Sequence, residues 1–332
     1  MMTDILNKHG IRVMEYMITI GVIITLNFCL PRMMPGDPFL SLAGEDGMET
    51  GQYTEKERQY HMAWYGLDRP VHLQYVSYLK NLAMGNWGYS IHFNDHVASI
   101  LLERLPWTLF LVLTAVVLST VFGVLLGAVS AWYQGRWIDG GIYLSLILIA
   151  EIPAFLLGLM LLFIFAAGYG WFPLSGAMTH FAVYGSGLER LADICRHAVL
   201  PVMSLTIVRS SGIYLLARSS MISTIEKEYI RTATAKGLPR RQIITRHVMR
   251  NAMLPVVTRV FLTLGSLVGG AILVENVFTY PGLGRLMREA VLLHDYPLIQ
   301  GIFLLVTGCV LTANFFADFL YVRIDPRVGK NQ

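Results

Sequence analysis

Two pairs of residues have the types and spacing that a chemical site would need. His92 and His96 stand four residues apart with Asp95 between them, and two imidazoles on one helical face could ligate a metal ion. Glu151 and Arg209 interrupt strongly apolar stretches, where an ionisable side chain indicates a transport pathway or a buried ion pair. An isolated histidine pair at this spacing is more often incidental, so His92 and His96 are weak candidates for metal ligands.

The common catalytic and nucleotide-binding patterns are missing from the sequence. It contains no G-x-x-x-x-G-K-[ST] loop that would cradle phosphates and no H-E-x-x-H zinc motif. The glycine-rich stretch GLGRL at 282–286 lacks the lysine and the hydroxyl that phosphate binding requires. The 3 cysteines have no C-x-x-C spacing. We therefore expect no catalytic residue and no cofactor site on this chain, and we do not expect an enzyme.

A strongly basic segment is the most distinctive polar feature. Residues 218–250 hold 8 Lys and Arg against 2 Glu. Within them the pattern predicts a helix over 221–236 that ends at Gly237, followed by a second helix that Pro239 opens. Apolar residues recur in that second helix at intervals of four, namely Ile244, Val248 and Ala252. A solvated loop that only touches anionic lipid would need no fixed corner between two helices. We therefore favour a rigid projection that binds a protein partner.

The elements that must position these residues follow from composition. The 332 residues are 55% hydrophobic and 14% charged, with a mean hydropathy of +0.53, which is typical of an all-α polytopic membrane protein. The net charge of +4 says less than the distribution of Lys and Arg, which places 218–250 and both termini in the cytosol. Six transmembrane helices are expected, at 13–30, 106–133, 139–168, 198–219, 254–275 and 298–321.

The segment between the first two spans is expected to be an ordered extracytoplasmic loop. The TEKE sequence at 54–57 matches a capping box that opens a helix. A second helix is predicted to begin near Pro70 and to end by Gly85. The chain then divides into four parts. These are an N-terminal tail with the first span (1–30), the outer loop (31–105), a core of five spans that includes the basic cytosolic segment 221–250 (106–322), and a C-terminal tail (323–332).

The sequence resembles the permeases of ATP-binding-cassette importers, in the branch that imports oligopeptides, dipeptides and nickel, and specifically their first, B-type subunit. The similar stretches cover nearly the whole chain in order. One departure is Arg231, where the general pattern has Glu six residues before the glycine, and another is Pro255, eighteen residues after Gly237. The longer spacing is similar to the peptide branch. The stretches are MPGDP at 34–38, GLDRPVHLQY at 66–75, IPAFLLGL at 152–159, GWFPLSG at 170–176, EYIRTATAKGL at 228–238, RHVMRNAMLP at 246–255, VENVFTYPGLGRL at 274–286, DYPLIQG at 295–301 and DPR at 325–327.

The resemblance implies a type I importer bundle that forms half of a pathway for peptides or for a nickel or other metal-chelate solute. It implies as partners a homologous second permease subunit, two cytosolic ATPases that use ATP and Mg, an extracytoplasmic substrate-binding protein and membrane lipid, with no nucleic acid. The location would be a bacterial or archaeal cytoplasmic (inner) membrane. The residues implied to contact an ATPase are Glu228, Tyr229, Arg231, Thr232, Ala233, Ala235, Lys236, Gly237 and Leu238.

An ion-coupled secondary transporter is the alternative. Such proteins carry intramembrane carboxylates and interrupted helices, and Glu151 followed by Pro153 fits that loosely. The chain shows no internal repeat, however, and a secondary transporter has no use for a coupling corner. Glu151 and Arg209 are expected at similar depth, about 15–18 Å from the cytosolic ends of their spans at 1.5 Å per residue. They are predicted to form a buried pair or to line the pathway.

Overall fold

The structure, a computed structural model, describes residues 2–34, 59, 62–63, 66 and 68–324. Within these residues the chain is helical, and the only extended pairing is an isolated bridge between Tyr89 and His96. The expectation of an all-α protein is therefore confirmed. The chain forms two compact units, one of Met1–Arg104 with Leu286–Gly308 and one of Leu105–Arg285 with Cys309–Gln332. Several helices pass from one unit into the other.

Unit 1 contains α1 (Met2–Arg32), α3 (Val71–Ala83) and the start of α12 (Tyr296–Ile324). Asn27 Nδ2 donates to the Gln300 carbonyl at 2.8 Å, and the Thr25 and Tyr75 hydroxyls share a hydrogen bond of 2.8 Å. The helix expected after Pro70 is confirmed as α3, and the chain leaves it through Gly85 with φ +74°. The capping box predicted at 54–57 lies outside the described residues.

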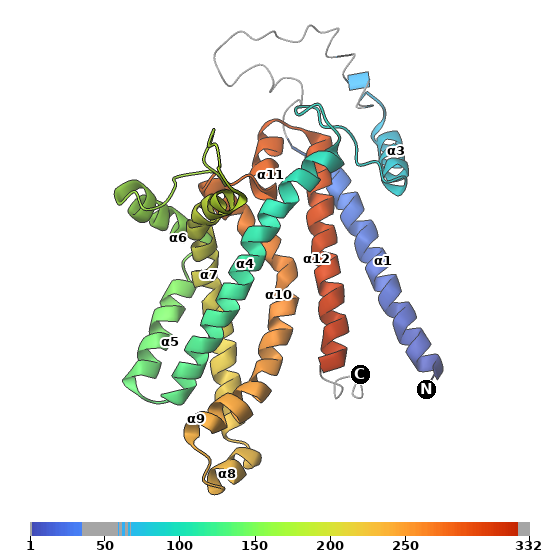
Figure 1. Cartoon of the computed structure of the whole chain (residues 1–332). Coiled ribbons are helices and arrows are strands. Elements are labelled where there is room, and N and C mark those ends of the chain that lie inside the picture. The colour runs from blue at the N-terminus through green and yellow to red at the C-terminus, as the bar shows by residue number, and fades with distance from the viewer. Residues whose placement is uncertain (1, 35–58, 60–61, 64–65, 67, 325–332) are drawn as a thin grey trace. The chain divides into compact units, whose positions relative to one another are not determined.

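Unit 2 holds most of α4 (Val97–Trp132), α5 (Trp137–Ala150), α7 (Gly187–Ile225) and α10 (Met249–Val277), drawn in Figure 1. Glycines let α4 and α7 approach closely, as the G-x-x-x-G spacing in α4 indicates. A Cβ added at Gly123 would lie 2.8 Å from the Ile213 Cβ, and one at Gly127 would lie 2.8 Å from the Ala217 Cβ. No larger side chain fits these two positions without separating the helices.

The span expected over 139–168 is broken rather than continuous. It consists of α5 and of a second piece, α6 (Ala154–Leu161) with η2 (Leu162–Gly168), which meet at a bend of 99°. Pro153 precedes α6 with ψ 137°. Because proline lacks an amide proton and disfavours helical geometry at the residue before it, the helix ends before Ile152. The third span expected over 139–168 therefore corresponds to a bent pair of helices and not to one continuous helix.

A buried carboxylate fixes the chain beyond α10. Glu275 accepts a hydrogen bond from the Thr108 hydroxyl at 2.7 Å and another from the Gly284 amide at 2.6 Å. Thr108 in turn accepts from the Leu283 amide at 2.8 Å. The first residues of α11 (Leu283–Leu292) are thus tied to α4 and α10 within unit 2.

Three helices in the described part of the chain are long and apolar enough to cross a membrane: α4, α7 and the Tyr296–Phe315 part of α12. The bent pair of α5 and α6 with η2 makes up to four spans. Met17–Arg32 of α1 is a shorter apolar helix. The predicted count of six spans is therefore not confirmed, although each predicted span falls on a helix or on the broken pair.

Candidate functional site: the coupling segment

The corner predicted at Gly237 is a helix cap of defined geometry. Helix α8 (Glu228–Ala235) is capped by Lys236, and Gly237 follows with φ +75°. The Gly237 amide donates to the Thr234 carbonyl at 2.9 Å, and the Leu238 amide donates to the Ala233 carbonyl at 3.4 Å. This pair of bonds is the Schellman pattern, which needs a left-handed residue after the helix. The glycine corner is confirmed.

The helix expected over 221–236 is in fact two helices. Met221–Ile225 completes α7, the chain turns at Glu226 and Lys227, and α8 begins at Glu228. Lys227 has extended backbone geometry, with ψ 146°. This turn brings Ile225 and Ile230 to the same cavity. The single long helix is therefore wrong, because burial of apolar side chains on both sides of the turn outweighs local helix propensity.

A second short helical stretch follows Pro239. It consists of α9 (Arg240–Gln242) and the π-helical turn η3 (Ile243–Val248), and it continues into α10. Ile244, Val248 and Ala252 are all buried, as their spacing predicts. Figure 1 shows α8 and α9 beyond the ends of α7 and α10 in unit 2.

The inner face of the segment is apolar and packed. Ile230 and Ala233 of α8, together with Ile243 and Val248 of η3, belong to one buried cluster with Met221 of α7. Beside this cluster lies a cavity of about 250 Å³, lined by Ile225, Ile230, Thr234, Leu238, Ile243 and Ile244. Apolar burial at about 25 cal/mol per Å² holds such a cluster together. The segment is thus seated on the end of α7.

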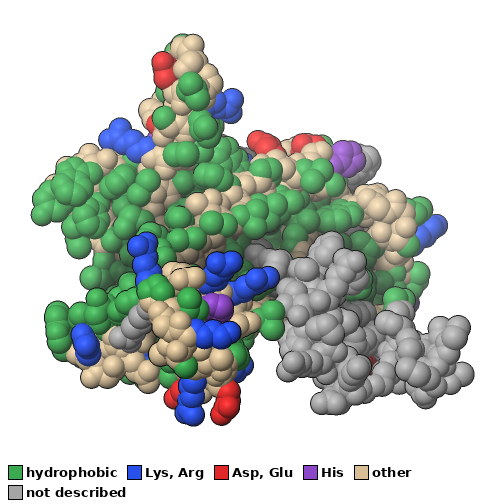
Figure 2. Space-filling view, turned by 60° about the horizontal axis from the view of Figure 1, so that its bottom comes forward, with side chains coloured by type: hydrophobic (Ala, Val, Ile, Leu, Met, Phe, Trp, Pro, Cys, Tyr) green, Lys and Arg blue, Asp and Glu red, His purple; other side chains and the backbone are tan. Residues whose placement is uncertain are grey.

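The outer face of α8 carries the polar side chains. Figure 2 shows Lys and Arg side chains grouped around this end of unit 2, with few acidic side chains among them. Ala233 is buried, so it packs the segment against α7 rather than offering a contact to a partner, and Leu238 is half-buried. The exposed members of the predicted contact set are Glu228, Tyr229, Arg231, Thr232, Ala235, Lys236 and Gly237.

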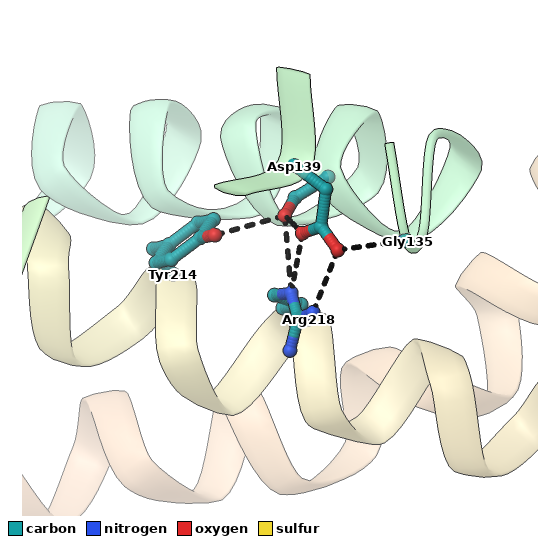
Figure 3. A network of polar contacts seen from close by, with 5 residues as sticks. Gly135, Asp139, Tyr214 and Arg218 are labelled. Atoms are coloured by element: carbon teal, nitrogen blue, oxygen red, sulfur yellow. Dashed lines mark hydrogen bonds and ion pairs between the residues drawn. The ribbon is translucent and has the colours of Figure 1, made fainter. Parts of the chain in front are cut away.

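A buried ion pair joins α7 to the hairpin of α4 and α5 close to this segment. Arg218 donates from Nε to one Asp139 carboxylate oxygen and from Nη2 to the other, both at 2.8 Å. The Ser130 hydroxyl also donates to Asp139 and shares a hydrogen bond of 2.8 Å with the Tyr214 hydroxyl. The Gly135 amide completes the set at 3.1 Å from Asp139, as Figure 3 shows.

The sequence analysis did not predict this network, because it counted Arg218 only among the basic residues of the cytosolic segment 218–250. Only 6% of the Asp139 side chain and 25% of the Arg218 side chain are exposed. A bidentate arginine fork of this kind fixes orientation as well as charge. The sequence did contain one indication of this pair, because Asp139 stands at the start of one predicted apolar span and Arg218 near the end of another. The network links the helix that leads into α8 to a second pair of helices.

The other predicted site residues are not brought together. Glu151 is exposed at the break between α5 and α6, and within the described residues no ion pair joins it to Arg209. Arg209 is half-buried on α7. A buried pair between them therefore finds no support, because the bend at Pro153 removes Glu151 from a continuous span.

The two histidines do not share a helical face. His92 lies in a turn, and His96 pairs with Tyr89 in the isolated bridge. His92 donates its amide to the Asp295 carboxylate at 3.0 Å, within unit 1. In the part of the chain that the structure describes, no group of three His, Cys, Asp or Glu could hold a metal ion. The shared helical face that would make His92 and His96 joint metal ligands is therefore not present, which agrees with their standing as weak candidates.

Known proteins that are similar to this chain over most of its length are all components of membrane transport systems. Residues 123–330 match the family described as "Binding-protein-dependent transport system inner membrane component". A peptide permease protein of Brucella suis biovar 1 is 35% identical over 94% of this chain and 96% of its own length. The di/tripeptide transport system permease protein DppB of Pseudomonas aeruginosa is 34% identical over 91% and 93%. A chain of the MetNI methionine ABC transporter in an inward-facing conformation has the same fold, with 15% identity, a TM-score of 0.53, and coverage of 68% of this chain and 96% of that one.

The backbone at Gly237 generates the first prediction. A Cβ there would meet no atom within 4 Å, so any effect of Gly237→Val must come from its positive φ, which costs a non-glycine residue about 1–2 kcal/mol. We expect Gly237→Val to uncouple ATP hydrolysis from transport in the reconstituted complex, while Gly237→Asn, which tolerates this conformation, retains both. Equal transport by the valine and asparagine variants would contradict a role for the corner's geometry.

The ion pair generates the second prediction. Removal of one partner from a buried pair costs about 3–5 kcal/mol, and somewhat less is expected here because Arg218 is partly exposed. Arg218→Gln and Asp139→Asn should each lower the melting temperature of the purified complex, and the double variant should lose less than the sum of the two single losses. Arg136→Gln, an exposed neighbour, is the matched control. Additive losses would mean that the two side chains act independently.

Proposed function

Because the chain belongs to the family of binding-protein-dependent transport system inner membrane components and is a permease subunit of an ATP-binding-cassette importer, we propose that it forms half of a peptide pathway driven by separate ATPases. The observation that carries the proposal is the Schellman corner at Gly237, which sets a rigid, outward-facing α8 on the end of α7. This family membership also replaces the alternative of an ion-coupled secondary transporter.

The exposed face of α8 is the surface that we assign to an ATPase partner. Most of its side chains are polar, and they lie beside an apolar cluster that anchors the segment. A partner that moves α8 moves the end of α7, and the Arg218–Asp139 pair passes that displacement to α4 and α5. Closure of two ATPases on ATP and Mg would in this way convert one packing of the helices into another. The chain itself lacks a phosphate-binding loop, so hydrolysis belongs to the partners.

Peptide is the cargo that the comparisons support best, because two relatives at 34–35% identity are named for peptide or di/tripeptide transport, and another at 34% is named for transport of glutathione, itself a tripeptide. A nickel or other metal chelate is less well supported, since the described residues offer no cluster of metal ligands. We propose further that the complex contains a homologous second permease subunit, two ATPases and an extracytoplasmic binding protein. The basic segment 218–250 would then lie in the cytosol with both termini, in a bacterial or archaeal inner membrane.

Reconstitution tests this function. The chain, co-expressed with a second permease subunit, two ATPases and a binding protein, should form a complex in nanodiscs whose ATP hydrolysis rises several-fold with peptide-loaded binding protein. A complex whose ATPases carry a substituted phosphate-loop lysine is the control and should show no hydrolysis. Peptide uptake by this chain alone, driven by an ion gradient, would contradict the proposal.

A further inference from the structure

A polar pocket of unit 1 lies where α1 ends and α12 begins. Arg32, the last residue of α1, and Tyr296, the first residue of α12, both line it. Its volume is about 270 Å³, room for about nine water molecules at ~30 Å³ each. All of its lining residues belong to unit 1. Because the apolar helix Met17–Arg32 ends here, the pocket stands at the level of the lipid headgroups, on the extracytoplasmic side of the proposed topology.

The lining of this pocket is basic and rich in hydrogen-bond donors. Among the described residues that line it there are two arginines, Arg32 and Arg69, and no Asp or Glu. Hydroxyl and amide side chains that can donate or accept surround the arginines, namely Ser77, Tyr78, Asn81, Asn86 and Gln300. A ligand that carries a negative charge and several further oxygen atoms therefore complements the pocket.

Gln74 of α3 ties the two arginines together. Its Oε1 accepts from Arg32 Nε at 3.0 Å and from Arg32 Nη2 at 2.8 Å, and its Nε2 donates to the Arg69 carbonyl at 2.8 Å. Arg32 Nη1 donates to the Phe28 carbonyl at 2.9 Å. These bonds use three of the five N–H groups of the Arg32 guanidinium, so two remain for a ligand on a side chain that is already oriented.

Gln300 of α12 supplies another polar group to the pocket. It is 9% exposed, and its Nε2 has no hydrogen-bond partner among the described residues. A buried amide nitrogen without an acceptor is uncommon in folded proteins. Since the last torsion of a glutamine side chain is broad, this amide can turn toward an oxygen atom that enters the pocket. An oxygen-rich ligand would thus satisfy a donor that the chain leaves unpaired.

Helix α3 packs along the last two turns of α1 within unit 1. The Tyr75 hydroxyl shares a hydrogen bond of 2.8 Å with the Thr25 hydroxyl, and the Tyr75 ring meets the Phe28 ring edge-on, with centroids 5.0 Å apart. The bonds between Arg32 and Gln74 complete the contact. The pocket-lining side of α3 is therefore fixed against the end of α1.

The outer face of α3 is apolar and exposed. None of the residues of α3 is buried, and the exposed fraction is 61% for Val71, 49% for Leu73 and 60% for Val76. The neighbouring turns of α1 also expose the large apolar side chains Leu26 and Leu30. Figure 1 shows α3 beside α1. Water would leave such a surface unfavourably solvated, whereas lipid acyl chains cover it.

We propose that this pocket binds the headgroup of an anionic phospholipid, with its phosphate at Arg32 and Arg69 and its acyl chains along the exposed apolar side chains of α1 and α3. A planar guanidinium matches a phosphate in two parallel hydrogen bonds. The charge of the pocket and the apolar surface beside it then fit the two ends of one molecule. Such a site does not depend on the cargo, so it goes beyond the proposed function.

The lining also selects among phospholipid headgroups. No carboxylate of the described lining could pair with the ammonium group of phosphatidylethanolamine or phosphatidylcholine. The hydroxyls of a glycerol headgroup, in contrast, can exchange hydrogen bonds with the side-chain amides of Asn81 and Asn86. Phosphatidylglycerol is therefore the lipid that fits this pocket best.

Lipid binding to the purified complex tests the proposal. The complex of this chain with the second permease subunit and two ATPases is stripped of lipid in a neutral detergent, and phosphatidylglycerol or phosphatidylcholine with the same acyl chains is added. Native mass spectrometry counts the bound lipids at about 0.15 M ionic strength, where the Debye length of ~8 Å screens distant surface charges. We expect phosphatidylglycerol to bind about tenfold more tightly, the scale of one charge-assisted hydrogen bond.

Variants of single basic residues locate the site. Arg32→Gln and Arg69→Gln should each weaken phosphatidylglycerol binding about tenfold and bring the two affinities close together. Lys80→Gln removes an exposed charge from the same helix, outside the pocket, and should leave both affinities within about twofold because of the screening. Arg69 is exposed, so Arg69→Gln decides the outcome if Arg32→Gln does not assemble.

Other occupants of the pocket give different results, and each overturns the proposal. Equal wild-type affinities for the two lipids, or equal losses in Lys80→Gln and Arg69→Gln, would mean that no headgroup is selected here. If an acidic residue of the binding protein occupies the pocket, Arg69→Gln will weaken association of the binding protein and leave lipid binding unchanged. If glycerol phosphate, which lacks acyl chains, competes as well as the whole lipid does, the apolar face takes no part.

Discussion

The bidentate ion pair between Arg218 and Asp139 is the interaction on which the proposed coupling of ATP hydrolysis to transport depends. Arg218 stands 7 residues before the last residue of α7, and α7 leads directly into the exposed helix α8. Asp139 lies near the start of α5, within two residues of Trp137. Since the carboxylate also binds Ser130 and Gly135, one buried group holds α4, α5 and α7 together. We therefore expect a displacement of α8 to pass through α7 to α4 and α5.

The corner at Gly237 and the apolar cluster beneath it form the other half of this arrangement. A left-handed glycine fixes the direction in which the chain leaves α8, and the buried side chains of Ile230 and Ile243 seat the segment on α7. The proposed contact surface on α8 is thus held against α7, the helix that it would move.

Features that depend on a single backbone position could be predicted from the sequence. Gly237 after a helix and Pro70 before one each express a local steric rule, and both are confirmed. Interactions between distant positions could not be predicted in this way. Asp139 and Arg218 are 79 residues apart, and nothing in the spacing of either shows that they meet. The turn at Glu226 and Lys227 was missed for the same reason, because tertiary burial there outweighs helix propensity.

The central claim is that α8, α7 and the α4–α5 hairpin move as one body, and a distance measurement across the ion pair tests it most directly. Spin labels on cysteines at Gln134 and Lys227, both exposed, would report the separation of the hairpin from the start of α8 after removal of the native thiols. In the assembled complex, this distance should stay constant between the nucleotide-free and ATP-trapped states, to within about 1.5 Å, the rise of one helical residue. A shift of about one helical turn, roughly 5.4 Å, would contradict the account.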